Sequence, residues 1–219
     1  MDLRLYEKYL AEIRMIANKN KQIACHATLD QSFHAALIAN PNLIMELGTG
    51  AKGLRTQAMC RAAALCDAWL VSVDIKDCLG CGNAWYGKWI FIQAEAREFG
   101  RIWPQWAGRK FGESREIDVL FVDLDELYET TLETWQIWNP YLAPKATLMF
   151  RCTNLQKKLY YPDGTSTMLG WDNKRGVIRV LEDALGLKFD ETREYTGEQN
   201  GWAIKHYPWG GGLSILKRI

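Results

Sequence analysis

The feature that most constrains the fold is an apolar run that ends in an acid and opens onto glycines, Leu43 to Gly53 (LIMELGTGAKG). Its apolar part has the character of a buried strand. Gly48, Gly50 and Gly53 suit a tight strand-to-helix turn, where a side chain would block the approach of a ligand to the backbone. The spacing G-x-G-x-x-G is also typical of pyrophosphate sites in nicotinamide and flavin enzymes. Spacing alone therefore predicts a nucleotide-binding turn without deciding the cofactor.

Two acids narrow the choice of cofactor. Asp74 ends a second apolar run, Trp69 to Val73, roughly 20 residues beyond the glycines, where an acid for ribose hydroxyls belongs in both cofactor classes. Glu46, two residues before Gly48, separates them. The combination resembles the class I S-adenosylmethionine (SAM)-dependent methyltransferases, whose first motif is E/D-x-G-x-G-x-G and whose second strand ends in the ribose acid. Here Gly53 displaces the usual third glycine by one place.

A later stretch extends the resemblance. Ile117 to Glu129 (IDVLFVDLDELYE), followed by Trp138 to Phe150 (WNPYLAPKATLMF), indicates a strand with an acid at its carboxyl end, a helix, a turn and another strand. It resembles the D-x-D-x-x-Y … W-x-P-Y-L-x-P-G-G … F-H-D stretch of small O-methyltransferases, including natural-product sugar and polyketide enzymes and the catechol and caffeoyl-CoA type. The resemblance extends from about Thr28 to the last strand.

Two departures bear on a metal. Several family members hold a divalent cation with acids at these strand ends, but this chain has Glu126 where a histidine is common and Arg151-Cys152 in place of His-Asp. Only Asp123, Asp125 and a Thr153 or Asn154 oxygen could supply the hard ligands that magnesium prefers. We therefore expect no metal.

The resemblance implies an α/β, Rossmann-like fold. Its seven-stranded, mostly parallel sheet would have the order 3-2-1-4-5-7-6, with the last strand antiparallel and helices on both faces. We expect one methyltransferase domain over 1–219, with a helical cap over 1–40 and a cofactor-binding core over 41–219. The expected helices are 3–17, 28–39, 54–64, 127–138 and 173–185, and the expected strands are 43–47, 69–74, 89–93, 118–123, 146–151, 188–196 and 212–217. A long aromatic loop, 197–211, would join the last two strands.

The site should lie outside the carboxyl ends of the strands, where strand order reverses. The resemblance implies SAM as cofactor, with its amino-acid part near the first strand and its ribose on Asp74. The expected cofactor-binding residues are Glu46, Gly48, Thr49, Gly50, Gly53, Asp74, Ile75, Gln93, Ala94 and Asp123.

Methyl transfer to a hydroxyl or a protonated amine needs a general base. His206, in the expected loop at the mouth of the site, is the first candidate, and the alternative for it is a surface histidine. His26 and His34 follow, with His34 favoured as structural because it falls on an expected helix. Asp123 would orient the acceptor or the sulfonium. We therefore expect His206 and Asp123 to be catalytic.

The ten tryptophans exceed the needs of a core. Several fall in expected loops, where their rings either hold a flat or cationic ligand or pack beneath long loops and at a dimer interface. If they line the pocket, the acceptor is a small aromatic or heteroaromatic molecule of specialised metabolism. The expected acceptor-binding residues are His26, Arg151, Trp202 and Trp209.

Charge and hydropathy exclude other partners. The 219-residue chain has 27 basic and 26 acidic residues, so it lacks the electrostatic footprint of nucleic-acid or membrane binding. No apolar stretch reaches the roughly 18 residues of a bilayer span, and the first residues do not resemble a secretory signal. We expect a cytoplasmic enzyme with a small-molecule acceptor, able to form a homodimer through its N-terminal helices.

Two alternatives stay open. A methyltransferase fold that binds SAM or an apolar ligand could catalyse non-methylating chemistry or serve as a binding protein. The replacement of the family's His-Asp by Arg151-Cys152 is compatible with that alternative. A nicotinamide-dependent oxidoreductase would need a Tyr-x-x-x-Lys motif or a substrate domain, and neither is evident.

Overall fold

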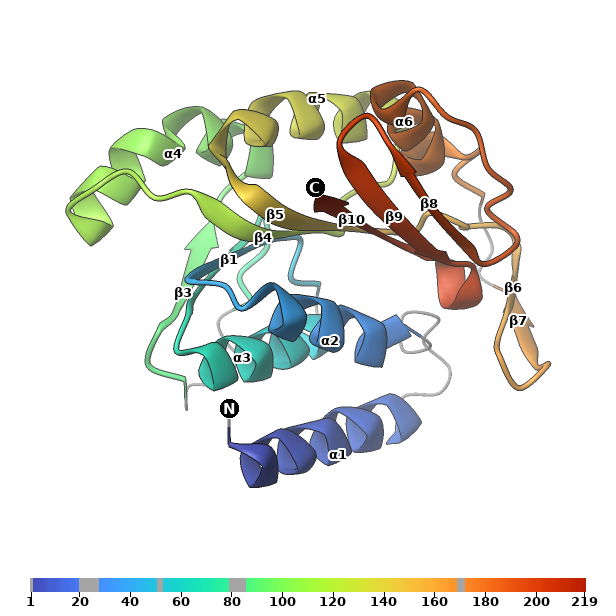
Figure 1. Ribbon diagram of the computed structural model, residues 1–219, viewed down its shortest axis with the longest axis horizontal. Helices are drawn as coiled ribbons and strands as arrows, with labels where there is room; N and C mark the ends of the chain where they lie inside the picture. The colour runs from blue at the N-terminus through green and yellow to red at the C-terminus, as the bar shows by residue number, and fades with distance from the viewer. Residues whose placement is uncertain (1, 20–27, 51–52, 79–85, 169–171) are drawn as a thin grey trace.

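The computed structural model describes residues 2–19, 28–50, 53–78, 86–168 and 172–219. Its centre is an eight-stranded sheet with the strand order β3-β2-β1-β4-β5-β10-β9-β8. Helices α1, α2 and α3 lie on one face, and α4, α5 and α6 cover the other (Figure 1). The strands of this sheet are β1 (Leu43–Leu47), β2 (Trp69–Asp74), β3 (Trp89–Gln93), β4 (Ile117–Val122), β5 (Leu142–Arg151), β8 (Tyr195–Gln199), β9 (Trp202–Tyr207) and β10 (Leu213–Arg218).

The first five strands pair in parallel, and their apolar composition follows from burial on both faces. β1 is buried along its whole length: Ile44 packs toward α2 and α3, and Met45 packs toward the opposite helices. β10 then pairs antiparallel with β5, β9 with β10, and β8 with β9. As a result, β9 runs parallel to β5, and its last residues reach the same sheet edge as the other carboxyl ends.

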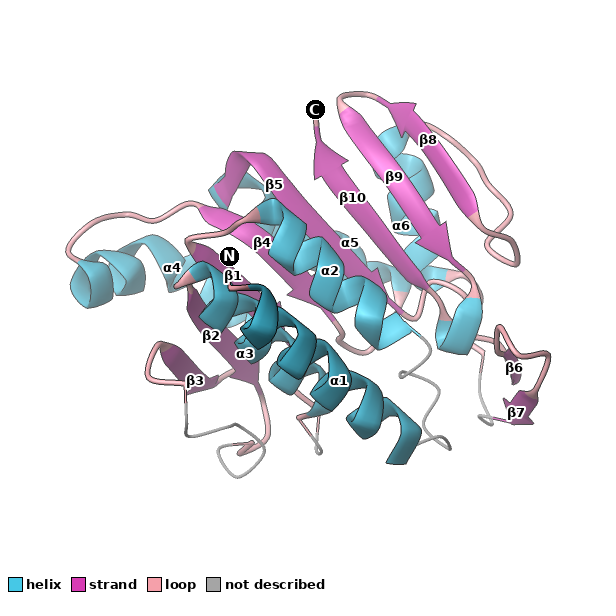
Figure 2. Cartoon of the chain, turned by 60° about the horizontal axis from the view of Figure 1, so that its bottom comes forward, coloured by secondary structure: helices cyan, strands magenta, loops and turns pink. Residues whose placement is uncertain are grey.

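The helices complete two hydrophobic layers (Figure 2). On one face α2 and α3 contact the sheet, and the amphipathic α1 packs over both of them. On the other face Trp103 of α4, Trp138 of α5 and Leu181 of α6 are fully buried. The helices are α1 (Leu3–Lys19), α2 (Leu29–Ala39), α3 (Leu54–Cys66), α4 (Ala96–Phe111), α5 (Tyr128–Trp138) and α6 (Gly176–Leu185), with 3-10 turns η3 (Asn139–Tyr141) and η4 (Trp209–Gly211).

The structure confirms the expected α/β fold and corrects its strand count. The central sheet has eight strands, because the expected aromatic loop over 197–211 contains β9, and β8 adds a new edge beyond it. A separate two-stranded hairpin, β6 (Lys158–Tyr160) and β7 (Ser166–Met168), precedes α6. Helix α4 was not expected. Pro104 lies inside it, where proline normally breaks a helix, but Trp103 and Phe99 anchor its buried face.

Within the described residues, none of the helices combines the length and the apolar character that a bilayer span requires.

Candidate functional site

A cleft of about 320 Å³ opens at the carboxyl ends of the parallel strands. It lies at the reversal of strand order between β1 and β4, where ligands bind in open α/β sheets. Its volume falls within the roughly 300–1,000 Å³ of small-molecule sites. The lining residues are Gly48, Gly50, Val73, Asp74, Ile75, Lys76, Ala94, Glu95, Ala96, Arg97, Asp123, Leu124, Asp125 and Thr130.

The glycine turn forms one wall of this cleft. Gly48 has a φ of +88°, and a Cβ at this position would overlap the backbone carbonyl of Asp123 at the end of β4. Gly50 also has a positive φ, of +67°, and no atom lies close to where its Cβ would be. Glycine is therefore needed at Gly48 for packing, whereas at Gly50 it keeps the backbone open toward the cleft.

Asp74 holds the turn in place. Its Oδ2 accepts hydrogen bonds from the backbone N–H of Thr49 at 2.9 Å and of Gly50 at 3.1 Å, and Oδ1 accepts from the N–H of Lys76 at 2.9 Å. Beside it, Ile75 is 64% exposed and Ala94 lines the cleft. Gln93 is absent from the described lining, and its amide donates to the carbonyl of Ile75 at 3.3 Å. The carboxylate thus lines the cleft, and its two oxygens can accept further hydrogen bonds.

Glu46 does not reach the cleft, contrary to its expected contact with the cofactor. Its side chain is fully buried beneath the turn and accepts hydrogen bonds from Ser72 Oγ at 2.5 Å and Thr56 Oγ1 at 2.9 Å. Burial raises the pKa of Glu46 to about 7, and the hydrogen bonds from Ser72 and Thr56, together with Arg55, oppose the rise only in part. Glu46 therefore supports the turn from below.

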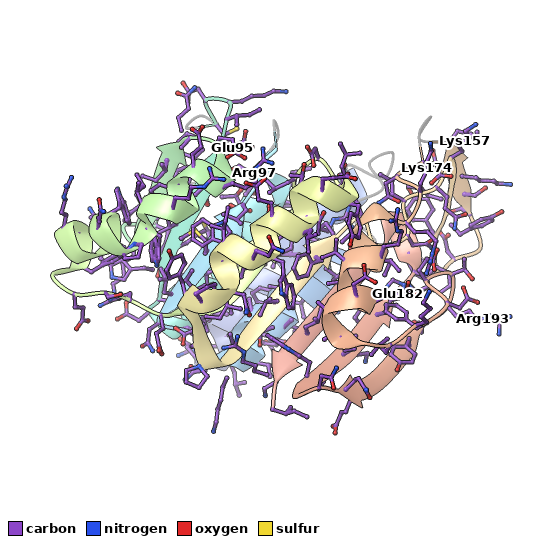
Figure 3. All side chains as sticks on the ribbon, turned by 90° about the horizontal axis from the view of Figure 1, so that it is seen from above. Glu95, Arg97, Lys157, Lys174, Glu182 and Arg193 are labelled. Carbon is purple, nitrogen blue, oxygen red and sulfur yellow. The ribbon has the colours of Figure 1, made fainter. Side chains whose placement is uncertain are left out.

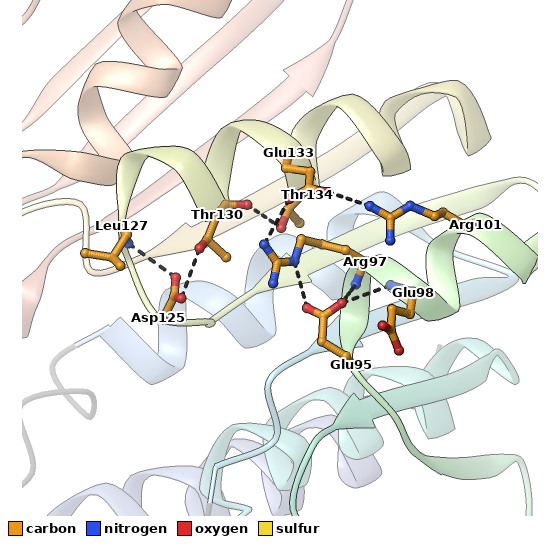
Figure 4. A network of polar contacts seen from close by, with 9 residues as sticks. All are labelled: Glu95, Arg97, Glu98, Arg101, Asp125, Leu127, Thr130, Glu133 and Thr134. Carbon is orange, nitrogen blue, oxygen red and sulfur yellow. Dashed lines mark hydrogen bonds and ion pairs between the residues drawn. The ribbon is translucent and has the colours of Figure 1, made fainter.

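A charged network forms the opposite wall (Figure 4). Glu95 caps α4 by accepting from the N–H groups of Arg97 and Glu98, and it also pairs with the Arg97 guanidinium at 2.8 Å. Arg97 continues to Glu133 of α5 at 2.9 Å. Figure 3 shows Glu95 and Arg97 together at the start of α4, well apart from the charged groups around α6. This wall is held together by ion pairs and offers both signs of charge to a ligand.

Arg55 and Asp123 form an ion pair at the β1 and β4 end of the cleft. Asp123 follows β4 and lines the cleft, whereas Arg55 lies in the first turn of α3. Gly53 caps this helix with a φ of +53°, and its N–H donates to the carbonyl of Gly50 at 3.0 Å. The pair therefore connects the helix that follows the glycine turn to the central strand.

The acids that resembled metal ligands have other partners here. Asp125 accepts from Thr130 Oγ1 at 3.0 Å, while Asp123, Glu126 and Cys152 bring one possible ligand atom each to within 4.8 Å of one another. However, Asp123 is paired with Arg55, and burial raises the pKa of the Cys152 thiol to about 12, which keeps it protonated. These groups do not fit a hard divalent cation, which prefers several ionised oxygen ligands. The absence of a metal stays a prediction.

Glu126 lies next to Asp123 in an environment that favours the neutral form of its carboxyl group. Its φ is +57°, and Cys152, with a φ of +56°, hydrogen-bonds its carboxyl group. Burial raises the pKa of Glu126, while the Cys152 hydrogen bond and the charges of Arg151 and Arg55 lower it and Asp125 raises it further. From α6, the backbone of Gly176 packs on the Glu126 carbonyl. Glu126 follows β4 and Cys152 follows β5, and two non-glycine residues in left-handed conformations at neighbouring strand ends are a sign of functional constraint.

His206 is not in a loop at the mouth of the site, as we expected, but on β9 and fully buried. Its Nε2 bonds the carbonyl of Glu191 at 2.8 Å and its Nδ1 bonds Ser214 Oγ at 2.9 Å. Burial lowers the pKa of His206, which favours the neutral ring. It is absent from the described lining of the cleft, so its geometry gives no support to a role as general base.

The other expected acceptor residues are scattered. Trp202 begins β9 and is 7% exposed in the core, with its ring centroid 5.8 Å from that of Trp135, so its expected loop position is wrong. Trp209 lies in η4 and donates to Glu194 at 3.3 Å. Arg151 is buried at the end of β5, where Nη1 donates to Thr28 Oγ1 at 3.1 Å and to the carbonyl of Gly212 at 3.3 Å. His26 lies outside the described residues.

The sequence analysis missed three charged residues of the cleft lining, Lys76, Glu95 and Arg97, and it also missed Arg55, which pairs with the lining residue Asp123. Glu95 had a signal, because an acid just after β3 and three residues before Glu98 can cap a helix. Arg97 had no signal in the sequence beyond its position two residues after Glu95. Arg55 could have been noticed only as the first charge after the glycines, since its partner Asp123 is far away in the sequence.

Comparison with known proteins identifies a methyltransferase domain in the chain. Residues 45–151 match the family model described as a methyltransferase domain, which confirms the resemblance to class I SAM-dependent methyltransferases. No curated protein matches the sequence.

Solved structures share the fold at low identity. A methyltransferase from Geobacter sulfurreducens has a TM-score of 0.57 at 19% identity, covering 96% of this chain and 89% of that one. The methyltransferase PaMTH1 of Podospora anserina, bound to S-adenosylhomocysteine (SAH), has a TM-score of 0.61 at 11% identity, covering 96% and 88%. The O-methyltransferase TomG of Streptomyces achromogenes, involved in tomaymycin synthesis and bound to SAM, has a TM-score of 0.61 at 13% identity, covering 96% and 89%. These likenesses show the fold.

Proposed function

We propose that this class I SAM-dependent methyltransferase binds SAM in the cleft and transfers its methyl group to an oxygen or nitrogen atom of a small aromatic or heteroaromatic acceptor. The observation that carries this proposal is Asp74, whose carboxylate lies in the cleft beside the backbone N–H groups of the glycine turn. A carboxylate there suits a pair of ribose hydroxyls, which are hydrogen-bond donors.

The orientation of the cofactor follows from this anchor. With the ribose on Asp74, the adenine lies toward Ala94 and Arg97 after β3, and the amino-acid part lies toward Gly48 and Asp123. The sulfonium then faces the ends of β4 and β5. In this arrangement the glycine turn is shaped by Gly48, Thr49, Gly50 and Gly53, and Ile75 covers the ribose. Glu46 and Gln93 do not contact the cofactor and instead support the backbone that does.

Methyl transfer from a sulfonium is an in-line displacement, so the protein mainly has to hold donor and acceptor in near-attack geometry and exclude water. A hydroxyl acceptor must also lose its proton. Asp123 lines the cleft, and the carboxyl group of Glu126 lies behind it, within 4.8 Å of the Asp123 carboxylate. Burial raises the pKa of Glu126, as a general base requires. We assign the proton to Glu126 and the positioning of donor and acceptor to Asp123, in place of His206.

A role in specialised metabolism is supported by the likeness to TomG, an enzyme of tomaymycin synthesis. A cytoplasmic location and a homodimer through α1 belong to the same proposal. Two exposed apolar residues of α1, Leu3 at 66% and Met15 at 49%, are available for such a contact.

The test of the cofactor assignment is isothermal titration calorimetry with SAM and SAH on Asp74→Ala. Loss of a charged acceptor for the ribose hydroxyls should weaken binding by about 1.5–3 kcal/mol, roughly tenfold to a hundredfold. If the affinity is unchanged, the assignment of the ribose hydroxyls to Asp74 is wrong.

The matched control is Asp118→Ala. The Asp118 carboxylate likewise accepts two backbone N–H groups, from Asn42 at 2.8 Å and Leu43 at 3.0 Å, but at the opposite edge of the sheet. If this variant weakens SAM as much as Asp74→Ala, the effect of Asp74 comes from backbone support. SAM binding without methyl transfer to any phenol, catechol or amine would favour a binding protein.

A further inference from the structure

Arg151, at the end of β5, is a buried cation without a carboxylate partner among the described residues. The residue is only 3% exposed. Its Nη1 donates to Thr28 Oγ1 at 3.1 Å and to the backbone carbonyls of Gly212 at 3.3 Å and Gly210 at 3.5 Å. Its Nε is buried without a hydrogen-bond partner in the part of the chain that the structure describes. All the acceptors that the guanidinium has are neutral, so no ion pair compensates its charge.

Other arginines of this chain show the usual arrangement. Arg61, which is 7% exposed, pairs with Glu12 at 2.8 Å, and the half-buried Arg175 pairs with Glu182 at 2.8 Å and with Glu191 at 2.6 Å. A charge removed from water is costly unless an opposite charge or strong hydrogen bonds replace the water. Arg151 has neither in full, so its surroundings favour the arrival of a negatively charged group.

The free edge of the guanidinium has the geometry that a carboxylate requires. Nε has no partner, and Nη2 makes no hydrogen bond to a described residue. These two nitrogens form the planar fork that binds both oxygens of a carboxylate, while Nη1 keeps its contact with Thr28. Gly210, Gly211 and Gly212, all with positive φ, bring only backbone to this turn, so no side chain of the turn covers the guanidinium.

Arg151 lies next to the groups to which we assign the chemistry. β5 pairs with β4, so the two strands end side by side, and Glu126 follows β4. Burial raises the pKa of Glu126, and the charge of Arg151 opposes this rise. Arg151 and Glu126 also line one small cavity together with Leu124, which lines the cleft as well. A group bound to Arg151 would therefore lie beside the β4 end of the cleft.

We propose that Arg151 binds a carboxylate of the methyl acceptor, so that the acceptor is an aromatic hydroxy acid whose hydroxyl faces Glu126. This inference rests on the proposed function, because it assumes methyl transfer at the β4 end of the cleft. The shared cavity, of about 10 Å³, has room for about one water molecule, so the half-buried Leu124 side chain turns aside when the carboxylate enters. The inference is specific to this chain, since Arg151 stands where the resembled enzymes have the histidine of His-Asp.

Two competing explanations make different predictions. If Arg151 only ties α2 to the glycine turn through Thr28 and the carbonyls, its loss lowers stability but treats charged and neutral acceptors alike. If it acts only through the pKa of Glu126, its loss changes turnover equally for both kinds of acceptor. Arg61→Gln is the control, because it also removes a buried guanidinium, and Arg61 is absent from the described lining of the cleft.

The experiment measures acceptor binding to the full-length protein saturated with SAH, by isothermal titration calorimetry. The probes are the isomeric monohydroxybenzoates and dihydroxybenzoates, each paired with the benzamide that has the same ring and hydroxyls without the charge. At least one acid should bind about tenfold or more tightly than its amide. Arg151→Gln should raise the Kd for that acid by about 10–100-fold and leave the amide within about twofold. Arg151→Lys should restore part of the affinity, since it keeps the charge but not the fork, and Arg61→Gln should change neither probe.

The outcomes separate this inference from the proposed function. If the unaltered protein does not bind SAH, the proposed function fails and this inference fails with it. If SAH binds but no acid is preferred over its amide, or Arg151→Gln weakens acid and amide equally, only this inference is wrong. The preference of the unaltered protein tests the inference even if Arg151→Gln does not fold, and thermal unfolding of each variant shows whether it does. Turnover of the preferred acid and its amide, measured as SAH formation from SAM, should fall in Arg151→Gln for the acid far more than for the amide.

Discussion

Glu46 beneath the glycine turn and His206 on β9 are both fully buried titratable groups, yet their surroundings differ. Glu46 is held by Ser72 and Thr56 directly under the backbone that lines the cleft. His206 bonds Ser214 and the carbonyl of Glu191, at the far side of the sheet from the glycine turn. In the β1–β4 region buried polarity supports a binding surface, whereas in the β8–β10 region it only completes the interior.

The largest effect that tests this difference between the two regions is expected from Glu126→Gln. If the β4 end performs the chemistry, this isosteric change should lower turnover by roughly 10²–10⁴-fold, because an amide cannot accept the proton of the acceptor. Turnover is measured as SAH formation from SAM with a panel of phenols and catechols. In the unaltered enzyme the rate should fall as pH drops through the raised pKa of Glu126, since the base must be ionised.

Glu129→Gln, three residues further and exposed on α5, is the control for that variant. Exhaustive chelation should leave turnover intact if a carboxyl base, and not a metal, activates the acceptor. Normal turnover in Glu126→Gln, or magnesium-dependent rescue after chelation, would each contradict the proposed mechanism.

His206→Ala tests the other region. The change removes a buried ring and its hydrogen bonds to the Glu191 carbonyl, Ser214 and Thr153. The free energy of unfolding should therefore fall by about 2–4 kcal/mol while SAH affinity stays the same. Denaturant unfolding and calorimetry measure the two quantities, with the exposed neighbour Lys205→Ala as control. A variant of normal stability that loses turnover would restore His206 as the general base.

The smallest effect is a pH dependence that sharpens the role of Glu46. Its folded-state pKa of about 7 lies above the unfolded value of 4.5, so the folded protein binds the extra proton. The associated stability is fully present below pH 4.5 and is lost as pH rises through about 7. Between pH 5 and 8 it should decrease by on the order of 1–3 kcal/mol.

Glu46→Gln should flatten that part of the stability curve, measured by denaturant unfolding at several pH values. The exposed Glu116→Gln should not. If Glu46→Gln keeps the full pH dependence, the group that titrates is a different one.

The fold was predictable wherever one strand carried its own signal. β1, β2, β4 and β5 are continuous apolar runs buried on both faces, and Asp74 and Asp123 are placed by the ends of such runs. β9 carried a weaker signal: Trp202, Ile204 and His206 are buried in strict alternation with more exposed residues. Its aromatic and charged composition concealed that alternation and made a loop the simpler interpretation.

The cleft was predictable only in part because some of its contacts are made between distant segments. Asp123, the partner of Arg55, follows β4, and Glu133, a partner of Arg97, lies on α5. No local spacing encodes either pair. For Glu46 the motif correctly indicated a position at the glycine turn but not the direction of the side chain. The side chain points under the turn, where Thr56 and Ser72 hold it.

The added edge strand β8 changes how the sheet meets its surroundings. Without it, β9 would present an unpaired row of N–H and C=O groups next to buried aromatic residues, which is a template for association with another chain. β8 moves that row outward to Thr196, Glu198 and Gln199, all of which are exposed and polar. Tyr195 lies over Gly197 of the same strand and covers the position that has no side chain. The eighth strand thereby protects this edge against aggregation.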